Sequence, residues 1–191
     1  MTSDHSGHLV TVVGLGPGAF EHLTVEALEE LKRADRIYVR TARHPTVEDI
    51  QAHLPHLEVH SFDAVYEVCD SFEEVYAQIV KQLFERAQLE DILYAVPGSP
   101  SVDETTVALL VELSKHNHWP VKIVQGLSYV EPVLAAAKLY DSSWTTVVDA
   151  FEIDLLASEN AVGEVPGKPG RLPWRAPTPA APLLVSQMHS R

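Results

Sequence analysis

The chain of 191 residues contains a single cysteine, Cys69. One thiol cannot form a disulfide within the chain, and it excludes a zinc site built from several cysteines. Low cysteine content is typical of proteins from reducing compartments, so we expect a cytoplasmic protein. The ten histidines are scattered over loop-like and strand-like segments, and no metal site is predicted.

Long apolar runs are absent as well. No stretch approaches the roughly 18 consecutive apolar residues that cross a bilayer as a helix. Residues 1–8 are polar, without the basic start and apolar core of a signal peptide. The sequence therefore predicts neither a membrane span nor a secretory signal.

Basic residues are scarce: 14 lysines and arginines face 27 aspartates and glutamates, which gives a formal net charge of −13 at pH 7. Nucleic acids and anionic membrane surfaces are bound by basic faces that neutralise phosphates. We therefore expect a small-molecule substrate, and neither nucleic acid nor a membrane as a partner.

Two arginines, Arg40 and Arg43, stand close together in the segment Arg-Thr-Ala-Arg-His-Pro. Guanidinium groups pair well with carboxylates and phosphates, so both residues are candidates for binding an anionic substrate. Arginines on a surface loop also serve solubility. The sequence leaves both interpretations open.

What the chain does contain is a repeated pattern, in which a continuous apolar strand runs directly into a glycine turn. The strands cover residues 10–13, 91–96 and 121–124, and the turns begin at residues 14, 97 and 125. Continuous apolar strands are typical of parallel sheets. Helical segments are expected at 24–32, 46–54, 71–84, 103–115 and 129–138. The predicted fold class is α/β, an open, mostly parallel sheet with helices on both faces.

The three glycine turns all follow the carboxyl end of a strand. In open parallel sheets, ligands bind at that edge, so we expect the turns to lie side by side and enclose one site. The first turn, Gly14-Leu15-Gly16-Pro17-Gly18, lacks the glycine spacing of a dinucleotide fingerprint and the Gly-Lys-Ser/Thr of a P-loop. Taken alone, it is either an ordinary tight turn or part of a ligand site.

The first turn and the segment that follows it carry a resemblance. Gly-Leu-Gly-Pro-Gly-Ala, followed by a helix ending in Lys-Arg-Ala-Asp, resembles the start of the tetrapyrrole (corrin/porphyrin) methylase superfamily. Residues 40–45 resemble more closely the methylase-like domain of MazG-type nucleoside triphosphate pyrophosphohydrolases, the YabN-like proteins. Residues 62–67 resemble the family's loop of aspartate, aromatic residue and glutamate, which either borders the substrate cleft or packs against the fold. Two positions depart from the superfamily pattern: Ser99 stands in place of a common aspartate, and Gln125 in place of the usual proline.

The resemblance implies that the chain uses S-adenosylmethionine as its cofactor. It places the cofactor contacts on the three turns and on a second lobe, while catalytic residues stay unassigned. The implied contacts are Pro17, Pro97, Gly98, Ser99, Val102, Ser128, Tyr129, Gln187 and Met188.

The resemblance and the change in composition together predict the domain organisation. Residues 1–155 form the first lobe, 156–182 a Pro/Gly-rich linker, and 183–191 the start of a truncated second lobe. The apolar edge left by that truncation predicts self-association, and we expect a homodimer. Two functions stay open: a methyltransferase with an unknown acceptor, or a non-catalytic ligand-binding or regulatory module from a MazG-type fusion.

Overall fold

The computed structural model describes residues 8–140, 145–149 and 183–186. The chain divides into two compact units that meet between Pro132 and Val133, and each unit is described by itself. Among the described residues, no helix has the length and apolar character needed to cross a membrane.

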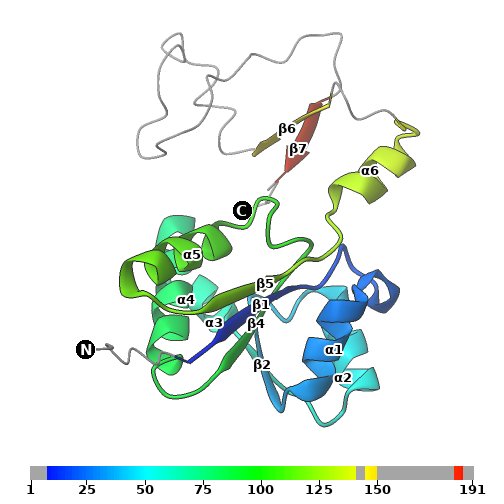
Figure 1. Ribbon diagram of the computed structural model, residues 1–191. Helices are drawn as coiled ribbons and strands as arrows, with labels where there is room; N and C mark the ends of the chain where they lie inside the picture. The colour runs from blue at the N-terminus through cyan, green and yellow to red at the C-terminus, as the bar shows by residue number, and fades with distance from the viewer. Residues whose placement is uncertain (1–7, 141–144, 150–182, 187–191) are drawn as a thin grey trace, which may run out of the picture. The chain divides into compact units, whose positions relative to one another are not determined.

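The first unit contains a five-stranded sheet in the order β3-β2-β4-β1-β5, in which every pair of neighbours is parallel. Helices lie on both sides of it (Figure 1). The predicted α/β fold with an open parallel sheet is confirmed. The elements, in chain order, are β1 (Val10–Gly14), the 3₁₀ helix η1 (Phe20–His22), α1 (Val25–Arg33), β2 (Arg36–Val39), α2 (Pro45–His53), β3 (Glu58–Ser61), α3 (Asp63–Val68), α4 (Phe72–Arg86), β4 (Ile92–Val96), α5 (Thr105–Asn117) and β5 (Val121–Val124).

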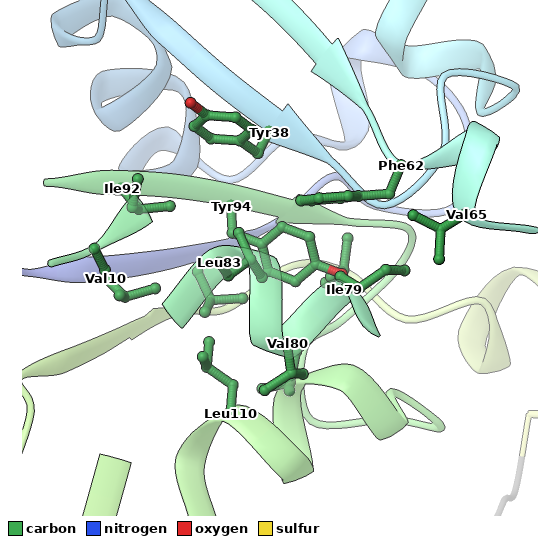
Figure 2. Packing of buried hydrophobic residues seen from close by; sticks show 14 of the residues in the cluster. Val10, Tyr38, Phe62, Val65, Ile79, Val80, Leu83, Ile92, Tyr94 and Leu110 are labelled. Carbon is green, nitrogen blue, oxygen red and sulfur yellow. The ribbon is translucent and has the colours of Figure 1, made fainter. Parts of the chain in front are cut away.

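The two faces of the sheet carry separate apolar cores, because successive side chains of a strand point to opposite faces. In β4, Tyr94 packs with α3, α4 and α5, whereas Leu93 and Ala95 pack with α1 and α2. Figure 2 shows the first core, with the Tyr94 ring near its centre. Phe62 meets that ring edge-on, with the two ring centres 6.1 Å apart. Both faces of the central strands are therefore buried, which explains their continuous apolar sequences.

Two helices begin as their sequences predict. The Thr24 hydroxyl caps α1 by accepting a hydrogen bond from the amide of Ala27 at 3.1 Å. The Ser71 hydroxyl caps α4 by accepting from the Glu74 amide at 3.2 Å, and the Glu74 carboxylate accepts from the amide of Asp70 at 3.1 Å. These caps fix the residues at which α1 and α4 begin.

The second unit contains a pair of parallel strands, β6 (Thr146–Asp149) and β7 (Leu183–Ser186). Helix α6 (Val130–Ala136) spans the boundary between the two units. The proposed linker at 156–182 lies outside the described residues.

Candidate functional site

The first two glycine turns are bonded directly to each other at the carboxyl edge of the sheet. The amide of Leu15 donates to the Val96 carbonyl at 2.9 Å. One step further, Gly16 and Gly98 form an isolated antiparallel bridge, with N···O distances of 3.1 and 2.8 Å. Both glycines have positive φ values, +73° and +66°, which glycine adopts at little cost. The turns after β1 and β4 therefore form one rigid unit.

The third turn packs against this unit through glycine alone. A Cβ atom built on Gly126 would lie 2.3 Å from the Gly98 carbonyl oxygen and 2.8 Å from Gly14 Cα. A Cβ atom on Gly14 would lie 2.6 Å from the Gly126 nitrogen. No side chain fits between Gly14 and Gly126, so the third turn meets the other two because glycine stands at both of these positions. The prediction that they lie side by side at one edge of one sheet is confirmed.

Hydrogen bonds accepted by Gln125 join the third turn to its neighbours. Its backbone carbonyl accepts from the Thr24 hydroxyl at 3.0 Å, which links the turn to the start of α1. Its side-chain Oε1 accepts from the Ser101 hydroxyl at 3.0 Å and from the Ser99 hydroxyl at 3.3 Å. The residue that replaces the family's usual proline thus contacts the residue that replaces its common aspartate.

The next residues of the third turn are also held by side chains. The Ser128 hydroxyl donates to the Glu131 carboxylate and accepts from the Val130 amide at 3.1 Å, which closes the first turn of α6. The Tyr129 hydroxyl donates to the carboxylate of Asp103. Asp103 has a φ of +51°, a rare conformation for a residue other than glycine. The second and third turns are therefore joined by side chains as well as by backbone packing.

A buried ion pair involves Glu104, which directly precedes α5. Arg40 Nη1 is 3.2 Å from Glu104 Oε2, and the two side chains are 17% and 3% exposed. The Thr106 hydroxyl donates to Glu104 Oε1 at 2.6 Å, and it therefore accepts from the Tyr94 hydroxyl, 2.9 Å away. Burial raises the pKa of the Glu104 carboxyl, while Arg40 and Thr106 act against that rise. This pair ties the end of β2 to the start of α5.

The segment after β2 is pinned at a second point. The Thr41 hydroxyl and the Ala42 amide donate to the Asp63 carboxylate at 2.6 and 2.9 Å, so α3 holds this loop in place. Arg43 is exposed. Burial, with Arg40 nearby, lowers the pKa of His44, which favours its neutral imidazole. The only full positive charges of this segment are therefore those of Arg40 and Arg43.

The structure brings most of the predicted cofactor-contacting residues to one edge. Pro17 lies in the first turn, four others lie in or just after the second, and two lie in the third. These are Pro97, Gly98, Ser99 and Val102, and then Ser128 and Tyr129. Gln187 and Met188 lie outside the described residues. Of the two arginines considered as candidates for substrate binding, Arg43 is exposed to solvent and Arg40 is paired with Glu104.

Two residues of this edge were assigned no role from the sequence. Glu104 resembles an ordinary acidic residue at the start of a helix, and only the fold places it against Arg40. Gln125 was noted as a departure from the family, but nothing in its neighbourhood predicted the two serine contacts. The one sequence feature that marks Gln125 is its position between a buried strand and Gly126.

Comparison with known sequences identifies the family. The family model described as tetrapyrrole (corrin/porphyrin) methylases matches residues 9–169. The uncharacterized protein YabN of Bacillus subtilis (strain 168) is 39% identical over 141 residues, a match that covers 74% of this chain and 28% of YabN. The chain thus spans little more than a quarter of the length of that relative.

Solved structures share the fold. A diphthine synthase matches with a TM-score of 0.58 at 22% identity, over 74% of this chain and 53% of the other. The cobalamin biosynthesis precorrin-6Y methylase of Archaeoglobus fulgidus matches with a TM-score of 0.54 at 21% identity, over 78% and 67%. Since the family model covers most of the sequence, and the sheet carries its three turns in the predicted order, the chain belongs to the tetrapyrrole (corrin/porphyrin) methylases.

Proposed function

We propose that this chain binds S-adenosylmethionine at the edge formed by the three glycine turns, and that it is a methyltransferase. The observation that carries the proposal is the direct packing of Gly14, Gly98 and Gly126, which leaves backbone rather than side chains at the carboxyl edge of the sheet. Family membership supports the same function.

The groups at this edge suit the chemistry of the cofactor. Among the described residues, no group accepts a hydrogen bond from the backbone amides of Leu127 and Ser128. The Leu127 side chain is 49% exposed although it is apolar. S-adenosylmethionine offers acceptor atoms on its adenine, ribose and carboxylate, together with an apolar ring face. Free amides beside an exposed leucine fit such a ligand.

The residues that we propose to contact the cofactor are those that the sequence resemblance implied. Backbone and side-chain groups of the three turns would hold the cofactor, and residues 187 and 188 would add contacts from beyond the described segments. The proposed set is Pro17, Pro97, Gly98, Ser99, Val102, Ser128, Tyr129, Gln187 and Met188.

Bound S-adenosylmethionine supplies an activated methyl group, which passes to a nucleophile as the bond to the sulfonium sulfur breaks. The work of this chain is then to hold donor and acceptor in line, which needs no covalent intermediate on the protein. Pro45 lies beside the first turn, since its Cγ is 3.8 Å from a Cβ built on Gly18, and the exposed Arg43 precedes Pro45 by two residues. We propose that Arg43 binds an anionic methyl acceptor, and that Arg40 holds this segment in place through its ion pair with Glu104.

A second candidate is a binding or regulatory module without turnover, carried by a larger protein of the MazG type. The length of YabN, of which this chain spans 28%, favours that arrangement. We place either protein in the cytoplasm as a homodimer. Methyl transfer to an acceptor separates the two candidates, since a module of this kind binds the cofactor and leaves it unchanged.

Calorimetric titration tests the proposed site. S-adenosylmethionine and its demethylated product S-adenosylhomocysteine are both expected to bind with one site per chain and dissociation constants of about 1–100 μM, ordinary for a small ligand. The absence of binding heat for both compounds, in protein that unfolds cooperatively, would contradict the proposal.

Gly98→Ala is expected to lower the affinity for S-adenosylhomocysteine at least about tenfold. A Cβ atom at this position points into space whose nearest neighbour is the Leu127 carbonyl oxygen, 4.0 Å away, so it clashes with none of the described residues and would enter the space proposed for the ligand. The positive φ of +66° costs an alanine about 1–2 kcal/mol of stability. Calorimetry measures the affinity, and thermal unfolding confirms that the variant is folded. Unchanged affinity would remove the second turn from the site.

A further inference from the structure

We infer that the N–H groups of the Gln125 carboxamide donate a hydrogen bond to an acceptor atom on the bound cofactor. This inference rests on the proposed function, because it concerns the ligand of the same site. Gln125 directly follows β5, and the next residue, Gly126, packs against Gly14 and Gly98. Its side chain therefore begins where the three turns meet.

The backbone of Gln125 is held in place. Its carbonyl accepts from the Thr24 hydroxyl at 3.0 Å, and the same hydroxyl accepts from the Ala27 amide at the start of α1. Val124, on its amino side, is fully buried. The side chain thus projects from a fixed point.

The orientation of the amide plane is also fixed. Oε1 accepts from the hydroxyls of Ser101 and Ser99, at 3.0 and 3.3 Å. Ser99 Oγ in turn accepts from the amide of Ser101 at 3.3 Å, so its single proton is directed to Gln125. Both lone pairs of the amide oxygen are occupied.

The amide nitrogen is left for a ligand. It lies on the other side of the planar carboxamide and carries two N–H donors. Within the part of the chain that the structure describes, no group accepts from Gln125 Nε2, and the residue is exposed. Ser99 is only 6% exposed, whereas Ser101 and Gln125 are exposed, so the amide lies at the protein surface, where its nitrogen is open to a ligand.

The chemistry at this point is the reverse of that implied by the family pattern. An aspartate at position 99 would present a negatively charged acceptor, which suits a donor on the ligand. Here the neutral Ser99 donates to the amide oxygen of Gln125, and the amide nitrogen of Gln125 offers N–H donors to a ligand. The matching ligand group is an acceptor: the carboxylate of the amino acid part, or an oxygen or nitrogen of the nucleoside.

Gln125→Glu tests this inference closely, because glutamate has the same shape. One carboxylate oxygen can still accept from Ser99 and Ser101, so a merely structural role is preserved. The outward group changes from a donor to a charged acceptor, since an exposed glutamate is ionised at pH 7. We expect the affinity for S-adenosylhomocysteine to fall at least about tenfold, with an unchanged melting temperature.

Two further variants separate charge from hydrogen bonding. Gln125→Ala removes the donors without adding charge, and it is expected to lose about three- to tenfold in affinity. Gln88→Glu is the matched control, since Gln88 is exposed and precedes β4 at the opposite edge of the sheet. It adds the same charge and is expected to bind as the wild type does.

The ligand series locates the acceptor. If Gln125→Glu weakens the binding of S-adenosylhomocysteine but not that of 5′-methylthioadenosine, which lacks the amino acid part, the amide donates to the carboxylate. If both weaken equally, it reads the nucleoside. Wild-type binding combined with unchanged affinity in Gln125→Glu and Gln125→Ala would overturn this inference alone, whereas failure of the wild type to bind would overturn the proposed function.

Discussion

Gly126→Ala is expected to destabilise the first unit by about 3 kcal/mol or more and to abolish cofactor binding. The added Cβ atom would lie 2.3 Å from the Gly98 carbonyl oxygen and 2.8 Å from two atoms of Gly14. All of these are backbone atoms of buried turns, so no rotamer change relieves the overlap. The third turn must move away from the other two. Thermal unfolding is expected to show a midpoint about 6–12 °C lower.

Gly98→Ala is the matched control for this effect. Its Cβ atom meets open space, and its cost comes only from the positive φ. The two variants add the same methyl group at the same edge, yet Gly126→Ala should lose far more stability. Equal melting temperatures for the two proteins would show that the turns are not packed backbone against backbone.

Glu104→Ala is expected to destabilise the protein by about 3–5 kcal/mol. The change leaves the guanidinium of Arg40 largely buried and without its carboxylate, and it removes the acceptor of the Thr106 hydroxyl. An uncompensated buried charge is far more costly than the pair itself is favourable. Urea unfolding followed by circular dichroism measures the loss.

Two comparisons isolate the role of burial. Arg36 and Glu58 are also 3.2 Å apart, but their side chains are 41% and 56% exposed, so Glu58→Ala should change stability much less. The double variant Arg40→Met/Glu104→Leu removes both charges and is expected to be more stable than Glu104→Ala alone. A Glu104→Ala protein as stable as Glu58→Ala would contradict the buried ion pair.

The sheet and the meeting of its turns were predictable from the sequence because both depend on local patterns. Strands buried on both faces need continuous apolar sequence, as in Ile92–Val96, and parallel strands bring their carboxyl ends to one edge. The caps at Thr24 and Ser71 are local for the same reason, since each satisfies an amide three residues away. Patterns of this kind carry no information about pairing between distant segments.

The features that escaped prediction depend on such pairing. Residues 62–67 were interpreted only as a segment that borders a cleft or packs, and six residues are too few to show helical periodicity, yet Asp63–Val68 forms α3. Its first carboxylate is used by Thr41 and Ala42, which lie two elements earlier in the chain. Glu104 and Gln125 gain their roles in the same way, from partners that only the folded sheet brings near.

The central claim is that the three glycine turns form one ligand site. Titration of the ¹⁵N-labelled protein with S-adenosylhomocysteine, followed by backbone amide chemical shifts, tests it most directly. We predict that amides of residues 14–18, 97–102 and 125–129 shift together along one saturation curve, while those at the amino edge of the sheet, around Asp91, stay in place. Saturable shifts confined to one turn, or centred at the amino edge, would contradict the claim.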